Sequence, residues 1–192
     1  DQPEALGLKY AVAQGIPVVT HPRAGFSTKR SQKEALYDAV RSFRPEVVAL
    51  AGFMQIVDAD FVSEFYGRLI NIHPSLLPEF PGLDTHARVI EERERRASEH
   101  NLTPLQHGCS VHFVDAGVDT GPLIAQAGLN VLPEENENEL AARVLALEHS
   151  LYPWSLSLLC SGDIRLCPPS ESIPLASVHY SPRAIDEAKQ NR

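Results

Sequence analysis

Residues 67–86 read GRLINIHPSLLPEFPGLDTH, an apolar run that ends in polar residues and then in proline turns. Pro74 lacks a backbone N–H and favours an extended residue before it, so the run predicts a strand that stops at His73. Side chains alternate along a strand, which places Asn71 and His73 on one side and the isoleucines on the other. The strand therefore delivers a polar pair to its carboxyl end.

An Asn-x-His pair can also do no more than cap a turn, but a second feature of the sequence favours a site. The stretch GCSVHFV at 108–114 alternates like a strand, and DAGVDTGP at 115–122 follows it with turn residues that hold Asp119 near the sheet edge. If Asp119 meets His73, its carboxylate favours the imidazolium form of the ring. We therefore expect Asn71, His73 and Asp119 to form one cluster.

This combination of side chains suits acyl transfer. An amide and an imidazolium can hydrogen-bond the oxygen that becomes negative in a tetrahedral intermediate, and one such donor typically lowers the barrier by about 3 to 4 kcal/mol. No serine or cysteine nucleophile is set up beside His73, so we expect direct attack by a substrate amine rather than an acyl-enzyme. The predicted catalytic residues are Asn71, His73 and Asp119.

The rest of the chain alternates between helical and strand-like segments. The segment EVVALAGF at 46–53 is apolar on both faces, as a central strand of a parallel sheet is. Such alternation predicts an α/β fold with a doubly wound, mostly parallel sheet, whose ligands lie beyond the carboxyl ends of the strands. The expected helices are 3–14, 31–43, one beginning near 58–60, 85–100 and 136–159, and the expected strands are 17–20, 46–53, 68–73, 108–114 and 122–131.

Length and composition limit the function classes. A chain of 192 residues with 43% hydrophobic residues suits one domain, which we place at 1–166, followed by a tail at 167–192 that we expect to be partly disordered. The net charge of −8 argues against nucleic-acid binding through a basic face. No apolar stretch reaches the roughly 18 residues of a membrane helix, and no signal peptide is recognisable. We therefore predict a cytoplasmic protein with small-molecule substrates and no nucleic-acid or membrane partner.

The cysteines and the other histidines receive plainer interpretations. Cys109, Cys160 and Cys167 are widely spread, without the spacing of a zinc site, so we expect reduced thiols and no metal. We interpret His107 and His112, which share a predicted strand, as ordinary strand or surface residues.

Four stretches together resemble a known family. They are AGFMQIV (51–57), GRLINIHPSLLPEFPGLDTH (67–86), HGCSVHFVDAGVDTGPLIAQ (107–126) and ARVLALEHSLYP (142–153). In this order they are similar to phosphoribosylglycinamide formyltransferase, also called glycinamide ribonucleotide transformylase, of the folate-dependent formyltransferases of purine biosynthesis. The similarity runs from about Ala5 to Leu166, and the combination is far more specific than any one stretch. It implies the Rossmann-like formyltransferase fold.

The resemblance implies an activity and roles for the catalytic residues. The co-substrate 10-formyltetrahydrofolate would donate its formyl group to the amine of glycinamide ribonucleotide. Asn71 and His73 would polarise the formyl carbonyl, and His73 would act as general acid. Asp119 would favour protonated His73 and help to position a water that shuttles protons.

The resemblance also implies binding residues. Lys29 or Arg30 would lie near the glutamate end of the folate, and Glu148 would contact the ribonucleotide. His86 would approach the ribonucleotide, although capping of the helix that follows it explains this residue equally well. The folate pteridine would lie against Met54, Gln55, Ile56 and Val57 and against the loop of Asp115, Ala116, Gly117, Val118 and Asp119.

The chain departs from the family pattern at its start. The family begins with a strand and a Gly-rich loop whose amides hold the ribonucleotide phosphate, and nothing here matches them. We therefore expect the formyltransferase domain to be incomplete at its N-terminus. The stretch ERERRASEHNLTPLQ at 92–106 is also longer than expected and suggests a surface insertion.

Three alternatives stay open. Formyltetrahydrofolate deformylase and methionyl-tRNA formyltransferase share the Asn, His and Asp arrangement, but the stretch 73–86 resembles the ribonucleotide enzyme more closely. A non-catalytic folate-binding protein is the third alternative, and a retained proton donor at His73 counts against it. A homodimer is compatible with the sequence.

Overall fold

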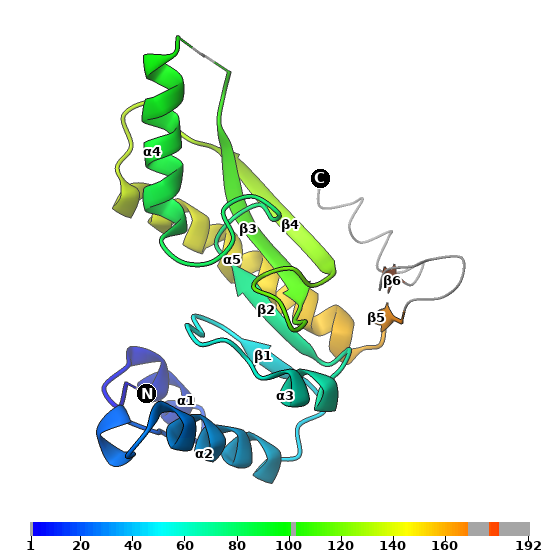
Figure 1. Ribbon diagram of the computed structural model, residues 1–192. Helices are drawn as coiled ribbons and strands as arrows, with labels where there is room; N and C mark the ends of the chain where they lie inside the picture. The colour runs from blue at the N-terminus through cyan, green and yellow to red at the C-terminus, as the bar shows by residue number, and fades with distance from the viewer. Residues whose placement is uncertain (1, 101–102, 169–176, 181–192) are drawn as a thin grey trace. The chain divides into compact units, whose positions relative to one another are not determined.

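Four strands form the sheet that carries the candidate site, in the order β1 (Val48–Leu50), β2 (Leu69–His73), β3 (Gln106–Phe113) and β4 (Leu123–Asn130). In this computed structural model β1 and β2 are parallel, whereas β2 and β3 pair antiparallel, as do β3 and β4 (Figure 1). The described sheet is therefore mixed, and it differs in this respect from the mostly parallel sheet expected from the sequence. For β3 and β4 the reason is that residues 114–122 alone connect them, whereas a parallel pair would need a crossover of a dozen or more residues.

The chain divides into two units, residues 1–46 and 47–192, and the structure describes residues 2–100, 103–168 and 177–180. The first unit holds α1 (Leu6–Ala13), the short 3₁₀ helix η1 (Arg23–Gly25) and α2 (Lys29–Ser42). Helix α2 begins in a capping box, in which Thr28 and Ser31 satisfy each other's backbone N–H groups. The strand predicted at 17–20 is wrong, because this segment has no strand assignment.

Register brings the polar positions of β2 and β3 together. Asn71 lies opposite His112, and His73 lies opposite Ser110. The isoleucines of β2 point to the other face, where they join the core with Val111. One strand face thus builds the core and the other builds the candidate site.

Helix α5 (Glu137–Cys160) covers one face of β3 and β4 (Figure 1). Its N-cap is Asn136, which accepts from the N–H of Glu139 while the Glu139 side chain accepts from the N–H of Asn136. Leu140 and Val144 of this helix are fully buried, and burial of one such side chain contributes about 1.5 to 3 kcal/mol. Tyr152 donates its hydroxyl to the carbonyls of Leu50 and Ile70, which ties the helix to the ends of β1 and β2.

The remaining elements complete the second unit. Helix α3 (Ala59–Glu64) buries Phe61 and Val62, and α4 (Thr85–Ser98) packs against α5. Strands β5 (Ile164–Cys167) and β6 (Ser177–Tyr180) form a separate antiparallel pair. Much of the predicted tail, residues 169–176 and 181–192, lies outside the described residues. No described helix has the length and apolar character needed to cross a membrane.

Candidate active site

A cavity of about 880 Å³ lies at the carboxyl ends of β1 and β2, where the sequence predicted a ligand site. Drug-sized ligands bind in cavities of this order. Four loop or strand segments and two acids of α5 form its wall. The lining residues are 50, 52–57, 71–74, 82–86, 112, 114, 115 and 117–119, together with Glu137 and Glu148.

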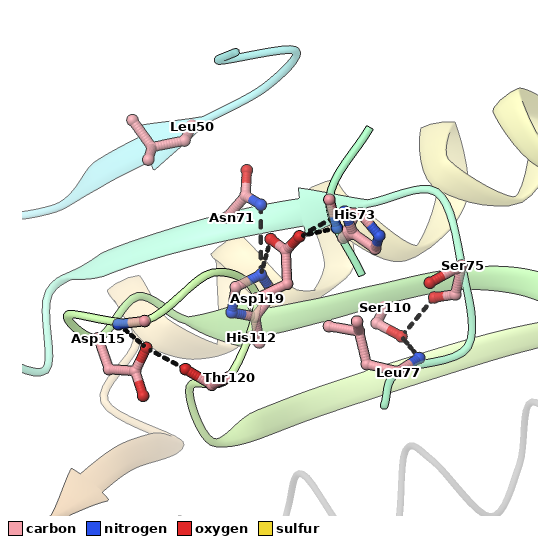
Figure 2. Close-up of polar contacts among 12 residues, drawn as sticks. Leu50, Asn71, His73, Ser75, Leu77, Ser110, His112, Asp115, Asp119 and Thr120 are labelled. Atoms are coloured by element: carbon pink, nitrogen blue, oxygen red, sulfur yellow. Dashed lines mark hydrogen bonds and ion pairs between the residues drawn. The ribbon is translucent and has the colours of Figure 1, made fainter. Parts of the chain in front are cut away.

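His73 and Asp119 meet at this strand end. Nδ1 of His73 lies 3.3 Å from Oδ2 of Asp119, and the two side chains are 6% and 14% exposed. Nε2 of His73 lies 3.0 Å from the carbonyl oxygen of Phe80. Carboxylate and carbonyl oxygens only accept, so the imidazolium form of His73 satisfies both contacts. Figure 2 shows this pair with Asn71 and His112 turned toward it.

His112 fixes the orientation of the Asn71 amide. Its Nδ1 lies 2.9 Å from the carbonyl oxygen of Phe113 and therefore carries the proton of the neutral ring. Nε2 is then an acceptor for the Asn71 Nδ2 group at 3.2 Å. An amide nitrogen has two hydrogens, so Asn71 keeps a second N–H for an oxygen in the cavity.

Asp119 sits in a left-handed backbone conformation with φ of 54° and is held from three sides. Burial raises the pKa of its carboxyl, but hydrogen bonds and charges from its surroundings, which include the amide of Gly82 and His73, outweigh burial and lower that pKa below its ordinary value. The Gly82 N–H donates to Oδ2 at 2.9 Å, and His112 Nε2 lies 3.6 Å from Oδ1. Asp119 is thus a carboxylate beside His73.

A buried hydrogen-bond network supports the turn that follows β2. The Ser110 hydroxyl donates to the carbonyl of Ser75 at 2.6 Å and accepts from the N–H of Leu77 at 3.0 Å (Figure 2). Gln126 of β4 donates to the same hydroxyl at 2.8 Å and to the carbonyl of Leu77 at 2.9 Å. The chain after His73 is therefore anchored to β3 and β4.

His86 of the cavity wall forms a second polar pair with His107, a buried residue of β3 that is not among the lining residues. Nδ1 of His86 lies 3.1 Å from Nε2 of His107, and His107 Nδ1 is buried without a hydrogen-bond partner among the described residues. Burial, with the charges of His86 and His73, lowers the pKa of His107 to about 4. Orphaned buried N–H groups are rare, which favours the proton of neutral His107 on Nε2. His86 Nδ1 then accepts, and its own proton sits on Nε2.

The cavity also has an acidic part and an apolar part. Burial raises the pKa of Glu148, which partly favours its neutral form, and His149 opposes this shift. Met54 and Ile56 are 74% and 68% exposed, although large apolar side chains usually avoid water. A flat apolar ligand that covered both side chains would remove this surface from water.

Most of the predicted site residues line this cavity. Ala116 is not among the lining residues, and Lys29 and Arg30 open α2 in the first unit, so their role at the folate glutamate stays a prediction. His86 does not cap α4: the N-cap is Asp84, and the His86 ring contacts His107 instead. The predicted residues that line the cavity are Met54, Gln55, Ile56, Val57, Asn71, His73, His86, Asp115, Gly117, Val118, Asp119 and Glu148. No described cluster of His, Cys, Asp and Glu could hold a metal ion.

Two site residues were missed in the sequence, and both are histidines of β3. His112 and His107 were interpreted as ordinary strand or surface residues, yet both are buried and contact side chains of the cavity wall. The antiparallel register of β2 and β3 is the signal that could have found His112, because it places this residue opposite Asn71.

The chain is similar in sequence to known proteins. Residues 1–156 match the formyl transferase family. The chain is 38% identical over 163 residues to the phosphoribosylglycinamide formyltransferase of Escherichia coli (strain K12), which covers 85% of this chain and 72% of that protein. It is also 38% identical over 168 residues, or 88% of this chain, to the trifunctional purine biosynthetic protein adenosine-3 of Drosophila melanogaster. The chain spans only 12% of that trifunctional protein.

Solved structures of formyltransferases are similar to this chain in fold. The phosphoribosylglycinamide formyltransferase from Coxiella burnetii superposes with a TM-score of 0.70 at 38% identity, over 85% of this chain and 72% of that one. The glycinamide ribonucleotide transformylase 1 from Symbiobacterium toebii superposes with a TM-score of 0.74 at 35% identity, over 94% and 77%. These matches confirm the Rossmann-like formyltransferase fold predicted from the sequence.

Proposed function

Because the chain belongs to the formyl transferase family, we propose that it transfers a formyl group from 10-formyltetrahydrofolate to the amine of glycinamide ribonucleotide in purine biosynthesis. One observation carries the proposal. The second N–H of Asn71 and the His73–Asp119 pair converge at one end of a cavity that also offers exposed apolar side chains. The names of the relatives support this choice of substrate.

The residues around the reacting carbon supply hydrogen bonds and one movable proton. In the overall reaction the substrate amine forms an N–C bond and loses a proton, while the folate nitrogen loses its formyl carbon and gains a proton. Asn71 and His73 hydrogen-bond the carbonyl oxygen as its negative charge grows. That oxygen competes with the Phe80 carbonyl for the proton on His73 Nε2, which lies 3.0 Å from Phe80. Protonated His73 is the general acid, and Asp119 stabilises its charge.

The two substrates are proposed to occupy different parts of the cavity. Exposed Met54 and Ile56 fit the flat ring system of a folate, and backbone groups of 115–119 fit its polar edge. Glu148 and the Nε2 proton of His86 fit the hydroxyl and amine groups of the ribonucleotide. The amine would then approach the formyl carbon from the α5 side.

The test follows the loss of the formyl group from 10-formyltetrahydrofolate with and without glycinamide ribonucleotide. We expect turnover that requires the ribonucleotide and that yields one formylated ribonucleotide for each folate consumed. Equal turnover without it, with release of formate, would instead identify a deformylase. Folate binding without any turnover would favour a binding protein.

A further inference from the structure

The loop 80–83 supplies two backbone groups to the catalytic pair. The carbonyl of Phe80 contacts His73 Nε2 at 3.0 Å, and the N–H of Gly82 donates to Asp119 Oδ2 at 2.9 Å. The loop therefore touches both members of the pair, one through an acceptor and the other through a donor. A small displacement of this loop changes both contacts at once.

The backbone of this loop and of the residue after it adopts strained conformations. Phe80 and Asp84 have φ values of 51° and 55°, in the left-handed region that side chains other than glycine rarely adopt, and Gly82 has φ of 81°. Such conformations persist where surrounding contacts over-determine them. The loop accordingly requires an external partner.

Arg88 provides contacts of this kind. Its Nη1 donates to the carbonyl of Pro81 at 2.6 Å and to the carbonyl of Leu83 at 3.3 Å. Its guanidinium also lies over the ring of Phe80, with Cζ 5.5 Å from the ring centroid. One side chain thus contacts the loop on both sides of Gly82.

The position of Arg88 is unfavourable for the helix that carries it. It lies in the first turn of α4, a turn that contains no acidic residue. A cation at a helix N-terminus opposes the helix dipole. The described contacts of the Arg88 guanidinium are thus with the loop.

We propose that Arg88 is a positioning residue of the formyl-transfer site, which holds loop 80–83 so that its backbone orients His73 and Asp119. The role in turnover rests on the proposed function, whereas the orientation of His73 can be measured without it. Arg88 touches neither substrate in this account and acts through the loop alone.

Three variants test the proposal. Arg88→Met removes the guanidinium, Arg88→Lys keeps a charge that can reach one carbonyl but lacks the planar fork, and Arg96→Met is the matched control. Arg96 lies on the same helix, where its Nε contacts Glu92 at 2.7 Å instead of the loop. We expect Arg88→Met to lower kcat about tenfold or more with both KM values within about twofold of wild type, because misplaced groups act on the chemical step. Arg88→Lys should restore part of kcat, and Arg96→Met should keep all of it.

A second measurement distinguishes the positioning role of Arg88 from the proposed formyl-transfer function. Nitrogen NMR of the imidazole of His73 should change in Arg88→Met and stay as in wild type in Arg96→Met, whether or not the wild type transfers formyl groups. An unchanged kcat and an unchanged His73 spectrum in folded Arg88→Met would overturn the proposal. Equal losses in Arg88→Met and Arg96→Met would overturn it as well. A silent wild-type enzyme whose His73 spectrum still responds to Arg88→Met would leave the positioning role standing and remove the proposed function.

Discussion

The amide of Asn71 has two N–H hydrogens, and His112 accepts a hydrogen bond from one of them. This contact separates the roles of the polar residues at the end of β2. Asn71 is a fixed neutral donor, whereas His73 has a proton that it can give up. The two residues therefore differ in what their loss should do to the kinetics.

Replacement of either residue should slow the chemical step. We expect His73→Ala to lower kcat by about 10² to 10⁴ and Asn71→Ala by about 10² to 10³, because each removes stabilisation made in the transition state. His179→Ala, at an exposed position of β6, is the control and should keep normal turnover. Steady-state kinetics and folate-binding measurements on each variant distinguish a slower chemical step from weaker binding. A variant of Asn71 that only weakens folate binding would contradict the role given to its amide.

The placement of Asn71 and His73 on one side of β2 could be predicted, because strand alternation acts over a few neighbours. The contacts of His112 and His107 could not be predicted, because their partners are distant in sequence: Asn71 lies on the paired strand β2 and His86 on α4. The side chains most dependent on tertiary contacts were therefore the ones missed.

His107 should make the fold sensitive to acid. Burial keeps its pKa at about 4 in the folded protein, below the ordinary value, so between these two values the unfolded chain binds a proton that the folded chain does not. This difference lowers the free energy of unfolding by about 2 kcal/mol when the pH falls from 7 to 5.

The comparison needs urea unfolding of wild type and His107→Gln at both pH values. The loss between pH 7 and pH 5 should be smaller in the variant by about the same 2 kcal/mol, since glutamine does not titrate. Identical losses in the two proteins would mean that His107 binds its proton equally well in both states.

At the scale of elements, the loop between β3 and β4 depends on one close backbone approach. A Cβ on Gly121 would lie 1.8 Å from the carbonyl oxygen of Phe113, so only glycine fits without a shift. The N–H of Phe113 donates to Pro122 at 2.9 Å on the same turn, which closes the loop onto β3. Asp119 is carried by this loop.

Gly121→Ala should therefore displace the loop and reduce turnover. We expect a loss of about tenfold to 10² in kcat, because a shift of about 1 Å at a catalytic group has effects of this size. Gly25→Ala is the matched control, since a Cβ there meets nothing within 4 Å. Kinetics and thermal unfolding of both variants would be compared. A Gly121→Ala protein with normal kcat would show that the approach to Phe113 does not place Asp119.

The boundaries of helices and strands could be predicted where the pattern of apolar residues was long. The helix expected at 136–159 is observed as Glu137–Cys160, and the strand expected at 68–73 is observed as Leu69–His73. The strand expected at 17–20 is not observed, because a short β-branched run becomes a strand only if another strand pairs with it. Strand direction also could not be predicted, since it is set by the connection and the register rather than by composition.

At the scale of the whole molecule, the net charge of −8 argues against a basic nucleic-acid surface, and this expectation stays a prediction. The candidate site combines a polar end, with His73 and Asp119, and an exposed apolar part, with Met54 and Ile56. Composition does not predict such an arrangement, because it arises where two strands end and two loops meet. The resemblance of the four sequence stretches did predict it.

The apolar part should govern folate affinity without governing chemistry. We expect the double variant Met54→Ser and Ile56→Ser to raise the KM for the formyl donor about tenfold at unchanged kcat, since about 1.4 kcal/mol of apolar burial is lost. Leu132→Ser removes another exposed apolar side chain, 48% exposed, that does not line the cavity, and it should leave KM unchanged. If the double variant binds the donor as wild type does, the folate does not rest on these side chains.

The proposed function requires that the formyl group passes directly from folate to the amine of the ribonucleotide. The most direct measurement traces a ¹³C-labelled formyl group of 10-formyltetrahydrofolate by NMR in the presence of glycinamide ribonucleotide, while mass spectrometry follows the protein during turnover. We predict that the label enters the amide of the formylated ribonucleotide and that the protein mass stays constant. Label in formate alone, or a protein that gains the mass of a formyl group, would contradict the account.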